Sequence, residues 1–559
     1  MPDPDSVAQL DLTPRDGTVY LDISREWREE FIYFVMVDRF HDDVERTPVR
    51  KAERAVGFQV PDTFYGGTIN GIAKHLDYIA ELGCTAVWLS PIFENNANSY
   101  HGYAIENYLR VDPRFGSKAD LINLVRAAHA RTPPMRVLLD VVINHSGDNW
   151  SYPGNVPYYY YNDIQFPFGA WRKDNRPIPL ELRQEKLYHR RGEIHSSNGY
   201  DVAPECQHGD ISSLKDFAND DDSIGSELIN ILIKAHCYWI READIDGFRV
   251  DAVKHMGTIA CSRFCSNIRE YAYGLGKHGF FLFGEVASAD DELLDRYIGP
   301  NTSLQDGGNT VFFGLDSALD FRLAFSLRYV LQGRADPGAL FSRLDAQRNR
   351  ALNRGEMGRY LVTFVDNHDG FWQPDGRIGH TADDKQVVAS IGYLLCALGT
   401  PCIYYGTEQG FSGFGSDNAM REAMFDRNVG GASLLNTENV IYRGISAVAK
   451  VMRANEPLRF GRMYFRQISG DGERFGFPYG NSYTLAFSRV LYAQEILVAY
   501  NVSGEPRSDY IVIDGSLHQP GDRLKFLLGN DRDVVVRRAA DGTINVQLPL
   551  APHEFVVLK

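Results

Sequence analysis

Three acidic residues each follow or end an apolar, strand-like run of the sequence. Asp251 lies in the run GFRVDAV, Glu285 in FFLFGEV, and Asp369 two residues after YLVTFVDN. Asp251 and Glu285 are separated by roughly the length of one strand–helix–strand unit, and Glu285 and Asp369 by roughly two. Because the carboxyl ends of parallel barrel strands open on one side, the three carboxylates are predicted to converge there.

Converging carboxylates beside an arginine and two histidines suit the cleavage of a glycosidic bond. The transition state of that reaction is oxocarbenium-like and positively charged, so anions stabilise it. One carboxylate can attack the anomeric carbon, and a protonated one can give its proton to the leaving oxygen. Arg249 lies two residues before Asp251 on the same side of its strand, so it can keep Asp251 ionised. Glu285 follows the apolar run 280–283, which favours the neutral form of a general acid.

Short apolar runs recur along the chain with helix-like segments between them. Near-continuous apolar character is typical of parallel strands that are buried on both faces. The alternation predicts an α/β fold, a (β/α)8 TIM barrel, rather than a doubly wound sheet, whose glycine-rich first turn is missing. Seven clear runs and one weaker run cover residues 31–37, 85–91, 136–144, 247–253, 280–286, 360–367 and 400–406, and 311–319.

Two departures from this pattern divide the chain further. The stretch 146–217 is too long for a strand–helix loop and is rich in Trp and Tyr, so we expect an inserted subdomain after strand 3. Near the end, short apolar runs separated by Gly, Pro and Asp predict a C-terminal antiparallel β domain, a β-sandwich. The expected regions are an N-terminal extension (1–30), the barrel (31–145 and 218–457), the inserted subdomain (146–217) and the C-terminal domain (458–559).

The composition disfavours several classes of partner. The chain has 559 residues and a formal net charge of −15, so nucleic acids and anionic membranes are disfavoured. Its first residues contain no apolar stretch, and its seven cysteines are an odd number without metal-ligand spacing, so we expect reduced thiols and a cytoplasmic location. The uncharged stretch 387–407 contains the breaker Gly399-Thr400-Pro401, which predicts a buried helix and strand rather than a membrane span.

Four short blocks of the sequence contain the acidic residues and their neighbours. They are DVVINH (140–145), DGFRVDAVKH (246–255), FGEV (283–286) and FVDNHD (364–369). Together with the segments HGY, VDPRFG and YYGTEQG, these blocks resemble the α-amylase family, glycoside hydrolase family 13, whose block order they keep. The resemblance covers nearly the whole chain and implies the barrel, the insertion and the C-terminal β domain.

The resemblance also implies a role for each acidic residue. Asp251 would be the nucleophile, Glu285 the general acid/base and Asp369 the transition-state stabiliser. The residues implied to bind the sugar or to position these acids are Tyr103, His145, Arg249, Lys254, His255 and His368.

A structural calcium ion between the barrel and the inserted subdomain is a further implication, and no organic cofactor is implied. Asn144 matches the family's asparagine after strand 3. Asp216, in the segment LKDF, is the closest counterpart of the family's aspartate late in the insertion, with Asp210 as the fallback. This segment lacks the proline and the final asparagine of the family's block.

The expected function is a retaining α-glucan hydrolase that cleaves α-1,4-glucosidic bonds in starch, glycogen or maltooligosaccharides. Alternatives within the family are a 4-α-glucanotransferase, a cyclomaltodextrinase or maltogenic enzyme, and a sucrose- or trehalose-active relative. A non-catalytic barrel scaffold is the alternative of another class, and such a protein should have lost one of the three acids. A metal-dependent barrel hydrolase would need clustered histidines, and no His-x-His occurs on the predicted strands.

Other acidic positions have structural interpretations. Asp140 and Asp246 are expected to anchor loops or to pair with Arg249. The run 220–222 of three aspartates is interpreted as a charge run that complements the dipole at a helix N-terminus.

Overall fold

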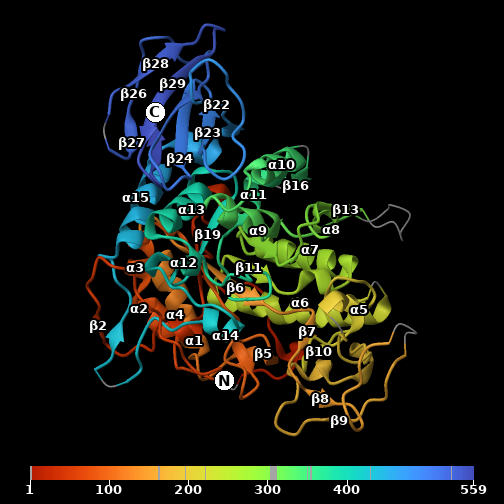
Figure 1. Cartoon of the computed structure of the whole chain (residues 1–559). Coiled ribbons are helices and arrows are strands. Elements are labelled where there is room, and N and C mark those ends of the chain that lie inside the picture. The colour runs from red at the N-terminus through yellow and green to blue at the C-terminus, as the bar shows by residue number, and fades with distance from the viewer. Residues whose placement is uncertain are drawn as a thin grey trace.

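Eight parallel strands form one sheet in the computed structural model, which describes residues 3–160, 164–195, 197–220, 222–302, 311–348, 350–352, 355–428, 430–530 and 532–559. The strands are β1 (Ile32–Val35), β3 (Ala86–Leu89), β6 (Arg136–Val141), β11 (Gly247–Val250), β12 (Phe281–Gly284), β15 (Ser317–Ala318), β18 (Val362–Thr363) and β19 (Thr400–Tyr404). Their order is β15-β12-β11-β6-β3-β1-β19-β18. A bridge between Leu319, just after β15, and Val362 joins the two edges. The predicted (β/α)8 barrel is confirmed (Figure 1).

Helices cover the outside of the barrel, as Figure 1 shows. Every residue of β1, β3, β11 and β12 is buried, which explains why these strands are largely apolar, with Arg249 of β11 as the charged exception. The main helices are α2 (Ile69–Lys74), α3 (Leu76–Leu82), α4 (Lys118–His129), α6 (Ser223–Ala243), α7 (Thr258–Gly274), α9 (Phe321–Val330), α10 (Gly338–Gln347), α13 (Asp384–Cys396) and α15 (Val440–Ala454).

The apolar spacing over 69–82 suggests one helix, but the structure contains two short ones, α2 and α3. The break lies at His75, whose ring Nδ1 is hydrogen-bonded to the carbonyl oxygen of Gly71 at 2.8 Å. The amide of His75 donates instead to the carbonyl of Ile72 at 3.0 Å. A side chain that takes the carbonyl four residues back displaces the regular helical bond, so the helix restarts one residue later.

The weak eighth run, 311–319, contributes only its last part to the barrel. β14 (Val311–Phe313) pairs antiparallel with β13 (Pro300–Thr302), and β15 alone joins the barrel sheet. Gly314 separates the two parts, and a Cβ at this position would lie 2.3 Å from the carbonyl oxygen of Tyr297. The close approach of two backbones at Gly314 lets the chain turn from the hairpin into the barrel.

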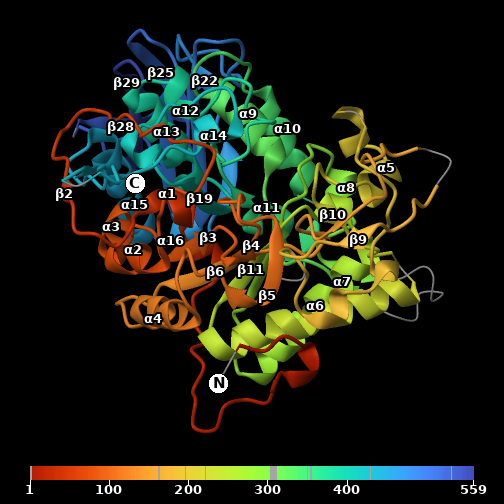
Figure 2. The same ribbon diagram turned by 90° about the horizontal axis from the view of Figure 1, so that it is seen from below.

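The segment after β6 forms a small, aromatic-rich region on one side of the barrel. Its ends pair with each other through β7 (His145–Ser146) and β10 (Lys215–Asp216), and it contains β8 (Trp150–Ser151), β9 (Ala170–Trp171) and α5 (Glu205–His208). Trp150 is fully buried and packs against the rings of Tyr152, Phe168 and Tyr188. Figures 1 and 2 show this region well away from the C-terminal sheets.

Two antiparallel sheets of five strands each follow α15. A separate hydrophobic cluster, including Leu497, Val546 and Val556, is buried in this region. The predicted runs appear as β23–β25, β29 and β30, whereas five other strands were not predicted. The strands are β21 (Arg462–Phe465), β23 (Thr484–Leu491), β24 (Gln494–Asn501), β30 (Phe555–Leu558) and β27 (Phe526–Leu528) in one sheet, and β22 (Ile468–Ser469), β25 (Arg507–Val512), β29 (Ile544–Leu550), β28 (Val534–Arg538) and β26 (Arg523–Leu524) in the other.

The uncharged stretch 387–407 folds as the end of α13 followed by β19, both buried. None of the helices in the described ranges is both long and apolar enough to span a bilayer. All seven cysteines are buried and unpaired, in agreement with the expected reduced thiols.

Candidate active site

The carboxyl ends of β11, β12 and β18 bring the three predicted acids to one mouth of the barrel. Strand register pairs Val250 of β11 with Gly284 of β12, so Asp251 and Glu285 leave neighbouring strands at the same level. The amide of Ala252, just after Asp251, donates to Oε2 of Glu285 at 3.2 Å. Ala252 has a φ of +51°, a conformation that non-glycine residues rarely adopt. The backbone therefore turns sharply at the two acids, as backbones often do at functional sites.

One buried arginine connects the acids. Nη1 of Arg249 lies 2.6 Å from Oδ1 of Asp251 and 2.9 Å from Oδ1 of Asp140. Its Nη2 lies 2.9 Å from Oε2 of Glu285. The predicted pairing of Arg249 with Asp251 and Asp140 is thus present, and the contact with Glu285 is additional. Two carboxylates on one guanidinium lie close together, which a retaining double displacement requires.

Acids outnumber cations at this mouth, and burial makes the imbalance costly. Burial raises the pKa of Asp251, while Arg249 opposes that rise. Burial, together with the charge of Glu285, raises the pKa of Asp369 to about 7. Burial also raises the pKa of Asp140 to about 6, although Arg249 opposes this as well. Near neutral pH the cluster can therefore hold a proton beside an ionised carboxylate, as acid catalysis with a nucleophile requires.

Asp369 is held by a residue that the sequence analysis did not find. Nη2 of Arg421 lies 3.1 Å from Oδ1 of Asp369, and Nε of Arg421 donates to the carbonyl of His368 at 3.0 Å. Arg421 also contacts Asp417 at 3.5 Å. The segment around Arg421 carries no motif and lies far along the chain from Asp369, so only the folded structure brings the two together.

Burial disfavours the charged form of the histidines at the mouth. Burial lowers the pKa of His145 to about 3 and that of His368 well below the ordinary range. Nε2 of His145 is buried and has no hydrogen-bond partner among the described residues. Neutral imidazoles can exchange hydrogen bonds with hydroxyl groups without adding positive charge near an oxocarbenium-like carbon.

Tyr103 forms part of the floor of the same mouth. Its hydroxyl donates to Oδ2 of Asp140 at 2.9 Å, and its ring stacks on that of His368 with centroids 5.3 Å apart. The ring of His101 also stacks on that of Tyr103, with centroids 5.7 Å apart. The buried Tyr103 thus connects Asp140 to the ring of His368 at the mouth.

Lys254 and His255 both contact the inserted region, and Lys254 also donates to the carbonyl of Ala287, two residues after Glu285, at 3.3 Å. Nζ of Lys254 lies 2.8 Å from Oδ1 of Asp201, and Nδ1 of His255 lies 2.7 Å from the carbonyl oxygen of Cys206. Both side chains thus hold the loop around α5 against the mouth of the barrel. The pair follows Asp251 after two intervening residues, which keeps both side chains near the acids.

The two residues expected to bind calcium do lie together, but their contacts do not fit that ion. Nδ2 of Asn144 lies 3.2 Å from Oδ1 of Asp216, and Nδ1 of His189 lies 2.6 Å from Oδ2. The fallback, Asp210, faces the ammonium group of Lys215 at 3.4 Å. Calcium prefers six to eight oxygen ligands, whereas these carboxylates are already surrounded by nitrogen donors.

The aspartate run before α6 divides into separate roles. Asp222 caps α6 by accepting a hydrogen bond from the amide of Gly225 at 2.8 Å, in agreement with the predicted place at a helix start. Asp220 instead pairs with His189 and His208, which the sequence analysis did not anticipate. Asp221 lies outside the described residues.

Fold and site together define a (β/α)8 barrel protein with an acid cluster at the carboxyl ends of its strands. The family model for the alpha-amylase catalytic domain matches residues 34–439. The chain belongs to the alpha-amylase family.

Known relatives and structures agree with this assignment. The chain is 29% identical to an alpha-amylase of Streptomyces lividans over 89% of this chain and 56% of that protein. It is 27% identical to a cyclomaltodextrin glucanotransferase of Klebsiella oxytoca over 74% of this chain and 64% of that one. It thus spans less than two thirds of either relative. The crystal structure of an alpha-amylase from Geobacillus thermoleovorans, complexed with acarbose, matches with a TM-score of 0.69 and 26% identity, covering 96% of this chain and 99% of that one.

Proposed function

We propose that this protein is a retaining α-glucan hydrolase that cleaves α-1,4-glucosidic bonds in starch, glycogen or maltooligosaccharides. The observation that carries the proposal is the guanidinium of Arg249, which contacts both Asp251 and Glu285 at the barrel mouth. A nucleophile and a proton donor must lie this close for double displacement at one anomeric carbon. Similarity to alpha-amylases over most of this chain adds support.

In the first step, Asp251 is the nucleophile and Glu285 the acid. A carboxylate oxygen of Asp251 bonds to the anomeric carbon while the glycosidic carbon–oxygen bond breaks. Glu285 gives its proton to the departing oxygen, which becomes a free hydroxyl of the leaving chain. Arg249 opposes the effect of burial on Asp251 and so favours its nucleophilic, ionised form.

In the second step, the glycosyl ester on Asp251 is hydrolysed. Glu285, now ionised, takes a proton from water, whose oxygen bonds to the anomeric carbon as the ester bond breaks. Both free carboxyl groups are then restored. Asp369, oriented by Arg421, would bind sugar hydroxyls and stabilise the positive charge of each transition state.

Transfer to a sugar hydroxyl is the second candidate, because it uses the same ester and differs only in the acceptor. The similarity to a cyclomaltodextrin glucanotransferase favours this alternative. A cyclomaltodextrinase or maltogenic enzyme, the other alternative within the family, would be a hydrolase. Product analysis over time on maltoheptaose separates the two. Shorter sugars alone support hydrolysis, whereas chains longer than maltoheptaose or cyclic products would contradict it.

The same experiment needs a variant without the nucleophile. Asp251→Asn should give no products above background on maltoheptaose or soluble starch. If the wild-type protein is equally inactive on every α-glucan, the barrel is a non-catalytic scaffold and the proposal fails.

A further inference from the structure

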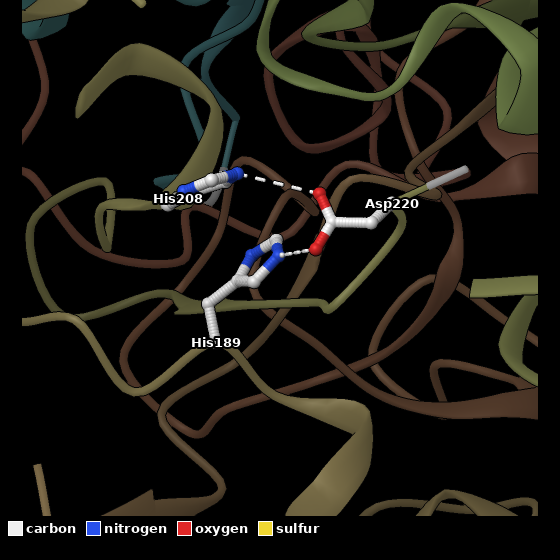
Figure 3. A group of neighbouring side chains, drawn as sticks. All are labelled: His189, His208 and Asp220. Atoms are coloured by element: carbon white, nitrogen blue, oxygen red, sulfur yellow. Dashed lines mark hydrogen bonds and ion pairs between the residues drawn. The ribbon is translucent and has the colours of Figure 1, made fainter. Parts of the chain in front are cut away.

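Two histidines and an aspartate from three separate segments meet outside the mouth of the barrel (Figure 3). Nε2 of His189 lies 3.0 Å from Oδ2 of Asp220, and Nε2 of His208 lies 3.3 Å from Oδ1 of the same carboxylate. The two imidazole rings are close, with centroids 4.5 Å apart. One potential ligand atom from each residue lies within 4.8 Å of the others.

Ligand atoms that lie this close to one another can share a single ion. A zinc ion binds imidazole nitrogens and carboxylate oxygens at about 2.0–2.2 Å, so its ligand atoms lie a few ångströms apart. Two nitrogens and one oxygen form a donor set that suits Zn²⁺ and related transition metals. Calcium, by contrast, prefers a shell made only of oxygens.

The surroundings of His189 provide a second, independent observation. Its other ring nitrogen, Nδ1, lies 2.6 Å from Oδ2 of Asp216, which is fully buried. Metal-binding histidines typically donate their second ring N–H to a carboxylate, which fixes the tautomer and orients the ring toward the ion. Asp216 holds His189 in this way, with Nε2 directed at Asp220.

The cluster is partly open to solvent, so an ion could reach it from outside the protein. His189 is buried, whereas the side chain of Asp220 is 47% exposed. Nδ1 of His208 is buried and has no hydrogen-bond partner among the described residues, and the contact of this ring with a charged group is that of Nε2 with Asp220.

We propose that His189, His208 and Asp220 bind one divalent transition-metal ion of the zinc class, with Asp216 positioning His189. The ion would connect the chain before residue 190, α5 and the start of α6. Because Cys206 of α5 contacts His255 next to the mouth, this connection would hold the α5 loop against the active site. The site is separate from the acids that carry the proposed reaction.

The direct test is metal binding by the full chain after chelator treatment and desalting. We expect the wild-type protein to bind one Zn²⁺ per chain, measured by calorimetry and by metal analysis after dialysis. Co²⁺ at the same site should give visible d–d absorption bands typical of nitrogen and oxygen coordination. Zn²⁺ should also raise the melting temperature of the protein.

Substitutions of the ligands should remove this binding in a graded way. His208→Gln and Asp220→Asn should abolish the Zn²⁺ equivalent and the Co²⁺ bands, while Asp216→Asn should weaken affinity by about 10–100-fold. His553→Gln is the matched control, because His553 makes a similar 2.6 Å contact with Asp383 elsewhere in the protein. Circular dichroism of each variant shows that it is folded.

Other results would overturn the proposal. If the wild-type protein binds no Zn²⁺, or if His208→Gln binds it as tightly, the cluster is a network of ion pairs only. If Ca²⁺ binds instead and persists in His208→Gln, the metal site lies elsewhere in the protein.

Discussion

The two ends of strand β11 each carry a buried aspartate, yet the two side chains are held in opposite ways. At the amino end, Asp246 lies 3.1 Å from Nζ of Lys277 and 2.8 Å from Nε2 of His129. Burial by itself would raise the pKa of Asp246, but Lys277 and His129 outweigh it and hold that pKa below its ordinary range. At the carboxyl end, burial raises the pKa of Asp251, and among the described residues the opposing charge in direct contact is that of Arg249.

The ratio of acids to cations accounts for this difference. At the amino end, Asp244 and Asp246 face two cations, so each buried charge has a partner in the folded protein. At the carboxyl end, three acids share the guanidinium of Arg249. Unmatched negative charge in a buried site is costly until a positive centre forms there, which is the condition for stabilising an oxocarbenium-like transition state. The same residue type thus stabilises the barrel at one end and serves reaction chemistry at the other.

The largest effect should come from Asp251→Asn. Removal of the nucleophile should lower kcat on maltoheptaose by roughly 10⁴-fold or more, because no other side chain can form the ester. The melting temperature should fall little or rise, since one buried acid is removed from an excess. Steady-state kinetics and a thermal melt check both results, and a variant with near wild-type kcat would show that Asp251 is not the nucleophile.

Glu285→Gln should have the next largest effect. Loss of the general acid should lower kcat on unactivated oligosaccharides by about 10²–10⁴-fold, with substrate affinity maintained. A substrate with a good leaving group, such as a nitrophenyl maltooside, needs less protonation and should recover much of the first step. Equal losses on activated and unactivated substrates would contradict the assigned role.

At the other end of β11, Asp246→Asn should act on stability alone. The change removes the buried negative charge that faces Lys277 and His129. Breaking a buried ion pair in this way should lower the free energy of unfolding by about 3–5 kcal/mol. Urea unfolding at pH 7 measures this loss. The kcat of the folded variant at low temperature should match that of the wild-type protein, and a large fall in kcat would show that the two ends are not independent.

The smallest effect concerns His129 and pH. Burial alone would lower the pKa of His129, but hydrogen bonds to Asp244 and Asp246 raise it to about 9. Folding therefore favours the protonated form of His129. Its contribution to the free energy of unfolding is complete below about pH 6.5 and is lost as the pH rises to about 9. The difference between the ordinary pKa of histidine and the raised pKa of His129 corresponds to roughly 3 kcal/mol of unfolding free energy at most.

Urea unfolding of the wild-type protein and of His129→Gln across this range isolates that contribution. The difference in unfolding free energy between the two proteins should shrink as the pH rises. A constant difference from pH 6 to pH 9.5 would mean that His129 does not change its charge in this window.

Much of the fold and part of the site follow from local patterns in the sequence. Strands buried on both faces are mostly apolar, so runs such as 281–284 are visible without a structure. Their order along the chain then places Asp251, Glu285 and Asp369 at strand ends on one side of the barrel. The pattern is weak at 311–319. A whole strand was predicted there, but only two of its residues join the barrel sheet.

Contacts between distant segments were decided only by the tertiary structure. Arg421 meets Asp369, and Asp220 meets His189 and His208, although no motif marks these pairs. Charged side chains on loops carry no periodicity, so their partners depend on how the loops pack. The sequence by itself determined which acids reach the mouth, because strand order and side-chain alternation are local properties. Which cation each buried acid receives, and hence whether it is paired or reactive, depends on segments that only folding brings together.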